Sequence, residues 1–243
     1  MEEELYRKFY EVEMAHWWFS ARQIIIMDLI RRKLDLPAGA KVLDVGCGTG
    51  AILSKLSERF EAYGTDTSDL AIEFCHRRGL SNAFCCTLET FPHPEIRFDL
   101  VTMLDVIEHI DDDLAVVRQA MEVLRPEGHL LVTVPAYQFL WSRHDELNHH
   151  KRRYTQPLLR HVLEQAGFTV EMLSHYNTFL FPTALLERMA AKVVAMGTDT
   201  TLKIPPLPIN TLLKSIFSFE RHILGKTTFP FGLSVIALAK RPS

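Results

Sequence analysis

Short apolar runs alternate with amphipathic stretches along most of this chain. Most of these runs are rich in Val, Leu and Ile, which is typical of strands buried on both faces of a parallel sheet. The stretches between them repeat apolar residues at the spacing of helices that cover such a sheet. The expected strands are residues 41–45, 62–66, 83–86, 98–104, 129–134, 168–173 and 233–239. The alternation predicts a doubly wound α/β sheet, whose ligands bind at the carboxyl ends of the strands.

Several residues mark where the helices begin and end. A long N-terminal helix is expected over residues 2–34. Ser68 or Asp69 opens a later helix, because a short polar side chain there can accept the first free backbone N–H groups. Thr155 caps another helix in the same way, and Gly167 follows its last turn.

The composition argues against several classes of protein. The net charge is −3, so the chain has no general attraction for nucleic acid or anionic membranes. Its four cysteines lack C-x-x-C spacing, and they imply neither a zinc site nor a disulfide framework. The N-terminus is acidic, unlike a signal peptide, and no apolar run reaches the roughly 18 residues of a membrane span. We expect a cytoplasmic protein that does not bind nucleic acid.

The first expected strand leads into a glycine-rich turn, K-V-L-D-V-G-C-G-T-G, at residues 41–50. The glycines let the backbone turn sharply against a ligand. Their G-x-G-x-G spacing differs from the G-x-G-x-x-G fingerprint of dinucleotide-binding proteins. Asp44, just before the turn, would repel a pyrophosphate but suits a cationic ligand. The turn therefore favours a cationic ligand over NAD.

Four motifs in order resemble those of the class I S-adenosylmethionine-dependent methyltransferases. Residues 41–50 resemble motif I of this family, and Asp66 ends the second expected strand. The sequence T-L-E follows the third strand at residues 87–89, with its acidic residue two places later than is usual in the family. Residues 98–110 are similar to motif IV of the branch that includes ubiquinone-biosynthesis O-methyltransferases. The resemblance covers residues 40–175 and implies a Rossmann-like sheet of seven strands with an antiparallel last strand.

The same resemblance implies that S-adenosylmethionine is the cofactor and S-adenosylhomocysteine the product. Asp66 would accept hydrogen bonds from the ribose hydroxyls, although an aspartate there also suits a helix N-cap. Leu88 and Glu89 would border the adenine, and residues 104–106 would line the methionine end. The implied cofactor-binding residues are Asp44, Gly46, Cys47, Gly48, Gly50, Asp66, Thr67, Leu88, Glu89, Leu104, Asp105, Val106, Trp18 and Arg22.

A further motif, A-H-W-W-F-S-A-R at residues 15–22, is similar to a signature of one bacterial subgroup of the family. That subgroup is associated with polyprenol, glycolipid or cell-envelope acceptors. We interpret residues 1–36 as a helical lid, with Trp18 near the methyl-donor end and Arg22 paired with the methionine carboxylate. Ordinary packing of the tryptophans in the core is the alternative. Residues 37–243 then form the methyltransferase domain.

A long loop between the fifth strand and the next helix is expected to contact the acceptor, because loops of this length in a compact domain are usually functional. It resembles the subgroup's W-x-x-H-D and H-x-R-R-Y pattern. A histidine suits the deprotonation of an oxygen nucleophile near neutral pH. His144, oriented by Asp145, is the first candidate base, with His109 and His149 as alternatives. The expected acceptor-binding residues are Trp141, Arg152, Arg153 and Tyr154.

The charged residues of this loop allow two other interpretations. Arg152 and Arg153 would hold a phosphate or carboxylate of the acceptor, and the alternative is a solvated basic face. Three histidines and an aspartate also invite a metal site. We predict none, because their spacing matches no compact helical pair of ligands and the nearby cations oppose one.

Residues 177–228 form an insertion before the last strand. An apolar helix is expected over residues 179–194, extended backbone over 204–210 because of its prolines, and a second helix over 211–224. The insertion packs over the acceptor pocket, forms a dimer interface or contacts lipid headgroups. Because its polar face is not richly basic, strong membrane adhesion is not predicted. Peripheral contact with the inner face of the membrane through residues 179–224 stays an alternative.

The sequence thus predicts methyl transfer to an oxygen of a small or lipid-linked acceptor. Quinone precursors and polyprenol- or sugar-linked intermediates are the first candidates. N- or C-methylation of another small molecule is the alternative among enzymes, and a non-catalytic S-adenosylmethionine-binding module is the alternative outside them. No oligomeric state follows from the sequence.

Overall fold

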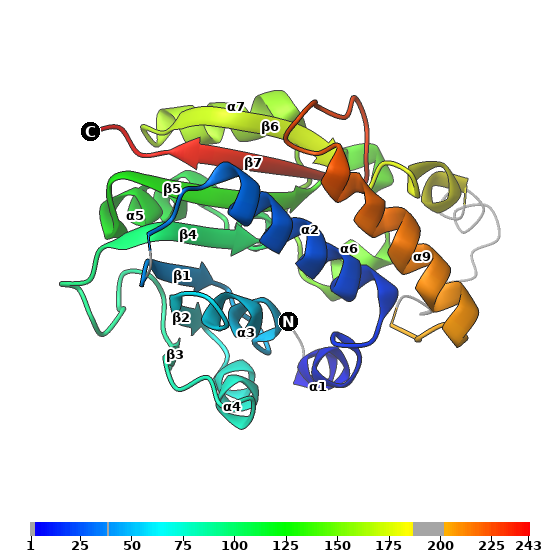
Figure 1. The fold of residues 1–243 in the computed structure, drawn as a ribbon, viewed down its shortest axis with the longest axis horizontal. Coiled ribbons are helices and arrows are strands. Elements are labelled where there is room, and N and C mark those ends of the chain that lie inside the picture. Colours follow the sequence, from blue (N-terminus) through cyan, green and yellow to red (C-terminus); the bar gives the residue numbers. More distant parts are fainter. Residues whose placement is uncertain (1–2, 38, 187–201) are drawn as a thin grey trace.

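The computed structural model describes residues 3–37, 39–186 and 202–243 (Figure 1). At its centre is a seven-stranded sheet with the strand order β3-β2-β1-β4-β5-β7-β6. The strands are β1 (Lys41–Val45), β2 (Glu61–Asp66), β3 (Ala83–Cys85), β4 (Phe98–Leu104), β5 (Leu124–Pro135), β6 (Thr169–Tyr176) and β7 (Ser234–Lys240). Strand β7 runs antiparallel to both of its neighbours, and the remaining pairs are parallel. The predicted doubly wound sheet with an antiparallel last strand is confirmed.

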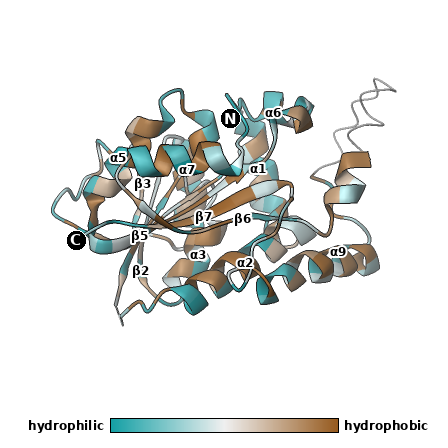
Figure 2. Ribbon diagram, turned by 90° about the horizontal axis from the view of Figure 1, so that it is seen from above, coloured by the Kyte–Doolittle hydropathy of each residue, from teal (hydrophilic) through white to brown (hydrophobic). Residues whose placement is uncertain are grey.

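Helices cover both faces of the sheet. The α-helices are α1 (Glu3–Val12), α2 (Trp17–Lys33), α3 (Ala51–Ser57), α4 (Asp69–Arg77), α5 (Asp113–Val123), α6 (Arg143–Leu147), α7 (Gln156–Gln165) and α9 (Leu207–Phe219), and the 3₁₀ helices are η1 (Ile107–His109), η2 (Gln138–Leu140) and η3 (Glu220–His222). Helices α2, α3 and α9 cover one face, and α5 and α7 cover the other (Figure 2). Each face of the sheet has its own hydrophobic core. Consecutive strand residues such as Val42 and Leu43 pack into different cores, because successive side chains of a strand point to opposite faces.

The N-terminal segment forms two helices, so the single helix expected over residues 2–34 is wrong. Residues 13–16 separate α1 from α2, and the His16 ring accepts a hydrogen bond from the Trp18 N–H at 3.2 Å, which caps α2. Ile25 and Ile26 of α2 are fully buried in the same core as the sheet. The boundary of the expected lid near residue 36 stays a prediction.

The second helix of the insertion begins earlier than expected. The prolines of residues 204–210 were expected to keep the chain extended, but α9 starts at Leu207 because a helix tolerates proline in its first turn. The Asn210 side chain accepts a hydrogen bond from the Trp17 N–H and donates one to the Ala15 carbonyl, both at 2.9 Å. These bonds fix α9 beside α2 (Figure 1). Among the helices of the described residues, none combines the length and the apolar character needed to span a membrane.

A buried carboxylate holds the start of the insertion. Glu220 is fully buried and accepts hydrogen bonds from the N–H groups of Asn177, Thr178 and Phe179 at 2.6–2.9 Å. Burial raises the pKa of Glu220, although the three N–H donors oppose this change. The helix expected over residues 179–194 begins here, and its part from residue 187 onward lies outside the described residues.

Replacing Glu220 with alanine is expected to lower the free energy of unfolding by about 3 kcal/mol, because three buried N–H donors lose their acceptor at once. Urea unfolding followed by circular dichroism measures the change. Glu164→Ala, which removes an exposed carboxylate on α7, serves as the control and should change stability little. Equal stability of the two variants would show that the Glu220 contacts do not support the insertion.

Candidate active site

The glycine turn joins β1 to α3 with its backbone in the left-handed conformation. Gly46 and Gly48 have φ values of 68° and 55°, which residues with side chains rarely adopt. A Cβ on Gly46 would lie 2.6 Å from Cγ2 of Val106, whereas no atom lies within 4 Å of a Cβ on Gly48. Gly46 is therefore packed against the chain that follows β4, and Gly48 faces space that a ligand can enter.

Two carboxylates lie at adjoining strand ends beside this turn. Asp44 is buried in β1 and accepts a hydrogen bond from the Thr102 hydroxyl at 2.6 Å. Asp66 ends β2 and accepts hydrogen bonds from the N–H groups of Gly48 and Ser68, both at 3.0 Å. Burial raises the pKa of Asp44 to about 7 and also raises that of Asp66. A ligand that brings positive charge or hydroxyl donors would therefore stabilise both carboxylates.

A third carboxylate, Asp105, follows β4 and pairs with a residue of α2. The Arg22 guanidinium lies 2.7 Å from its carboxylate, and the Thr133 hydroxyl donates a hydrogen bond to it at 3.2 Å. The Arg22 guanidinium carbon also lies 5.3 Å from the centre of the Trp18 ring. The structure thus brings Trp18 and Arg22 to the strand end that the sequence assigned to the methionine part of the cofactor. Their contact with that part stays a prediction.

The residues expected at the adenine side differ in their exposure. Leu88 is buried, whereas Thr67 and Glu89 are exposed. Cys47, within the glycine turn, is buried with its Sγ atom 3.9 Å from that of Cys75. An apolar contact from Leu88 fits the buried position, and the roles of the other residues stay predictions.

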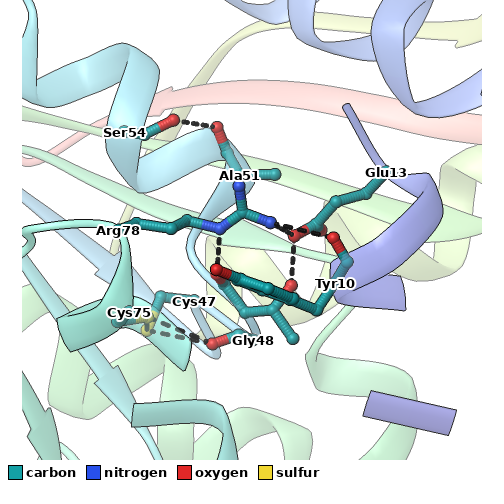
Figure 3. A network of polar contacts seen from close by, with 9 residues as sticks. Tyr10, Glu13, Cys47, Gly48, Ala51, Ser54, Cys75 and Arg78 are labelled. Carbon is teal, nitrogen blue, oxygen red and sulfur yellow. Dashed lines mark hydrogen bonds and ion pairs between the residues drawn. The ribbon is translucent and has the colours of Figure 1, made fainter. Parts of the chain in front are cut away.

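The N-terminal segment lies over the glycine turn, which sequence reasoning did not anticipate in detail. The Tyr6 hydroxyl of α1 donates a hydrogen bond to Asp66 at 3.4 Å. Glu13 is buried and accepts a hydrogen bond from the Thr49 hydroxyl. It also pairs with the Arg78 guanidinium at 2.6 Å (Figure 3). The Arg78 Nε group donates a further hydrogen bond to the Thr49 carbonyl at 2.8 Å. These contacts dock α1 on the turn and on α4, and the role of this segment as a lid stays a prediction.

Replacing Glu13 with alanine is expected to increase the fraction of molecules in which α1 is detached from the glycine turn. Losing the charged hydrogen bonds costs about 1.4 kcal/mol, and trypsin cleavage after Arg7 and Lys8 in α1 should accelerate about tenfold. Mass spectrometry of timed digests measures the rate. Glu11→Ala, on an exposed position of the same helix, should digest like the native chain. A Glu13 variant no faster than this control would mean that other contacts hold α1.

A second cluster lies where β4 leads into η1. Glu108 is fully buried, and neither of its carboxylate oxygens has a hydrogen-bond partner within the described residues. The rings of His109 and His150 lie 4.7 Å apart, and one ligand atom from each of the three side chains lies within 4.8 Å of the others. Burial, with a contribution from Asp105, raises the pKa of Glu108 well above its usual value. Burial and then His150 lower the pKa of His109 to about 4, so this imidazole is neutral at pH 7.

Asp145 organises the loop that follows β5. It is fully buried, and its two oxygens accept hydrogen bonds from the Nε and Nη2 groups of Arg153 at 2.8 and 2.9 Å. The same carboxylate lies 2.9 Å from Nδ1 of His150 and accepts the Ser142 N–H at 2.8 Å. Burial acts to raise the pKa of Asp145, but His150 and Arg153 hold it well below its usual range. Asp145 therefore orients His150, a residue that the sequence analysis did not select as a candidate base.

The other predicted acceptor-side residues are placed as follows. His149 is exposed, and the side chain of His144, in α6, lies outside what the structure describes. Arg152 pairs with Asp113 at 3.0 Å, and the buried Tyr154 hydroxyl donates to the same carboxylate at 2.6 Å. Trp141 is half-buried. Arg152 and Arg153 thus have carboxylate partners within the protein, while their predicted contact with the acceptor is untested.

Comparison with known proteins identifies relatives of the same kind. The model of a methyltransferase domain family matches residues 16–173. A phosphoethanolamine N-methyltransferase of Triticum aestivum is 34% identical over 42% of this chain and 22% of its own length. A probable S-adenosylmethionine-dependent methyltransferase of Mycolicibacterium smegmatis is 30% identical over 64% of this chain and 61% of its own length. A ubiquinone biosynthesis O-methyltransferase of Actinobacillus pleuropneumoniae is 31% identical over 50% and 60% of the two chains.

The chain covers less than two thirds of the length of each of these curated relatives. Among solved structures, a mycolic acid cyclopropane synthase is similar with a TM-score of 0.59 and 16% identity, covering 99% of both chains. At this identity the similarity shows a shared fold.

Proposed function

This chain belongs to the methyltransferase domain family, as its motifs predict, and we propose that it transfers the methyl group of S-adenosylmethionine to an oxygen of a small or lipid-linked acceptor. The observation that carries the proposal is the row of carboxylates Asp44, Asp66 and Asp105 on three neighbouring strands beside the open space at Gly48. Ligands of doubly wound sheets bind at this edge. A row of acidic side chains suits a nucleoside that carries positive charge.

The residues present fit such a cofactor. Asp66 has an oxygen that already accepts a hydroxyl donor from Tyr6, so it can accept a ribose hydroxyl in the same way. Asp44 is buried, no cationic side chain of the described residues forms an ion pair with it, and a positive charge nearby would favour its ionised form. Arg22 has a buried Nε group without a partner in the described part of the chain, which leaves a donor for a carboxylate. When bound, S-adenosylmethionine supplies an electrophilic methyl group on a positively charged sulfur.

The groups that act on the acceptor are proposed to lie around η1 and the loop after β5. Methyl transfer mainly requires that the protein position the acceptor, and an oxygen nucleophile must also lose its proton. His109 and His150 bring two imidazoles to the end of β4, and Asp145 fixes the orientation of one of them. His144 as the base, with His149 as an alternative, stays a prediction.

A lipid-linked acceptor is favoured by the surface of α9. Four apolar side chains along this helix are exposed by half or more of their surface: Leu207, Ile209, Leu212 and Phe219. Large exposed apolar side chains grouped on one element often mark contact with an apolar partner. The relative from ubiquinone biosynthesis supports an oxygen acceptor, because its name assigns it O-methylation. The phosphoethanolamine relative favours N-methylation as the second candidate function.

Mass spectrometry of lipid and metabolite extracts, incubated with the full chain and isotopically labelled S-adenosylmethionine, tests the proposal. A labelled ether or methoxy product together with S-adenosylhomocysteine is the expected result. A labelled amine would move the assignment to N-methylation. Binding of the cofactor without turnover in any extract would identify a non-catalytic module and overturn the proposal.

A further inference from the structure

One carboxylate and two imidazoles from separate segments meet beside β4. Glu108 and His109 belong to η1, and His150 lies in the loop after α6, yet their ligand atoms lie within 4.8 Å of one another. The Lys151 N–H donates a hydrogen bond to the Glu108 carbonyl at 2.7 Å, which ties the two segments together next to the cluster. The juxtaposition is therefore built into the backbone and does not depend on the side-chain rotamers alone.

Glu108 gives an independent sign that a ligand is required here. Its side chain is fully buried, and both oxygens lack a hydrogen-bond partner in the described residues. A buried carboxylate in this state is costly unless a cation or donors compensate it. Protonation would remove the buried charge, but the remaining carbonyl oxygen would still lack a donor. A cation bound beside Glu108 would compensate the charge directly.

His150 is oriented as the histidine ligands of metal sites are. Its Nδ1 atom lies 2.9 Å from Asp145, whose carboxylate is held in turn by the buried guanidinium of Arg153. A carboxylate on Nδ1 keeps the proton there and places the lone pair on Nε2. The same arrangement of carboxylate, histidine and metal supports ligands in many metalloproteins. The buried Asp145–Arg153 pair therefore has a purpose beyond the stability of the loop.

We infer that Glu108, His109 and His150 bind a divalent zinc ion with one coordination position open to the acceptor. Two imidazoles and one carboxylate are a donor set that zinc takes at catalytic sites, where the fourth position holds water or substrate. Zinc bonds of about 2.1 Å place neighbouring ligands roughly 3.4 Å apart, so the side chains need only converge slightly.

Such a cation would also explain how the acceptor oxygen is activated, and this part of the inference rests on the proposed function. An acceptor hydroxyl in the open position would lose its proton to solvent more readily, because the cation stabilises the oxygen anion that remains. His109 and His150 then act as ligands, and no imidazole has to take the proton. The ion itself is inferred from the protein side chains and does not depend on methyl transfer.

Isothermal titration of the chelator-treated full chain with zinc chloride alone tests the ion. The native chain is expected to bind one equivalent, and Glu108→Gln and His150→Ala should each weaken binding on the order of 100-fold or more. His161→Ala, an exposed histidine on α7, is the matched control and should bind like the native chain. Circular dichroism identifies any variant that fails to fold, and His109→Ala then replaces it.

The outcomes are separable from those of the methyl-transfer assay, because no methyl donor is present. If the native chain bound no zinc, or if both ligand variants bound it as tightly as the control, the inferred site would be refuted, even for an active methyltransferase. Zinc binding that depends on Glu108 and His150 in a chain without activity would support the ion and overturn only its proposed role toward the acceptor.

Discussion

A Gly48→Leu variant is expected to lose affinity for S-adenosylhomocysteine by about 100-fold or more while keeping its fold. No atom lies within 4 Å of a Cβ at this position, so the core has no contact with the new side chain. The leucine would instead fill the space between the glycine turn and the ligand. Overpacking of that kind costs about 3 kcal/mol, which corresponds to roughly 100-fold in affinity. Titration calorimetry measures the affinity, and thermal unfolding reports the fold.

The chain offers a control with nearly the same backbone. Gly79, after α4, also has a positive φ, 81° against 55°, and also has no atom within 4 Å of a Cβ. Leucine at either position carries the strain of left-handed backbone, about 1–2 kcal/mol. Only the variant at Gly48 places the side chain at the strand ends. If Gly79→Leu lost affinity equally, backbone strain would explain the effect, and the glycine turn would no longer mark the site.

The sheet and the acidic row at its edge were predictable because each depends on local sequence. An apolar run followed by an acidic residue predicts both a buried strand and the position of its carboxyl end, as at Asp44 and Asp66. Parallel strands share one carboxyl edge, so these residues must lie together once the strands pair. The start of α9 was not predictable in this way, because proline is compatible both with extended chain and with the first turn of a helix.

The contacts that the sequence did not predict all join residues that lie far apart in the chain. Their separation in sequence does not follow the repeat of a helix or a strand. Tyr6 reaches Asp66 across 60 residues, and Glu13 reaches Arg78 across 65. No motif or regular spacing in the sequence indicates either contact. The motif at residues 15–22 suggested a lid, which stays a prediction, and it did not indicate which residues would hold the N-terminal helix in place.

The same reason explains why His150 was not among the candidate catalytic residues and why the prediction of no metal did not consider this cluster. The argument against a metal considered the spacing of residues within the loop. The cluster in the structure takes Glu108 and His109 from the end of β4 and only His150 from the loop. The cations that appeared to oppose a metal are also engaged, since Arg153 pairs with Asp145 and Arg152 with Asp113. The number of cationic residues near a site in the sequence therefore overstates the positive charge at the site when carboxylates already neutralise them.

Asp145→Ala is expected to lower the free energy of unfolding by about 4 kcal/mol at pH 7, because Arg153 would be left buried without its carboxylate. Urea unfolding measures this value. Because the folded-state pKa of Asp145 is held low, its contribution is fully present above the pKa of an unfolded aspartate, about 3.9, and is lost as the pH falls below it. The stability difference between native chain and variant should therefore narrow in acid.

Asp111→Ala provides the matched comparison, because it also removes an aspartate from an ion pair, with Lys151, but from a position whose side chain is 84% exposed. Its effect on stability should be small and should be reduced by salt. A similar small loss for Asp145→Ala would mean that Arg153 finds another partner when the loop rearranges. In that case Asp145 would not be the residue that orients His150 toward Glu108. The Asp145 variant should then bind zinc as tightly as the native chain does. We expect instead a 10- to 100-fold weaker zinc site in this variant, the usual cost of removing the carboxylate behind a histidine ligand.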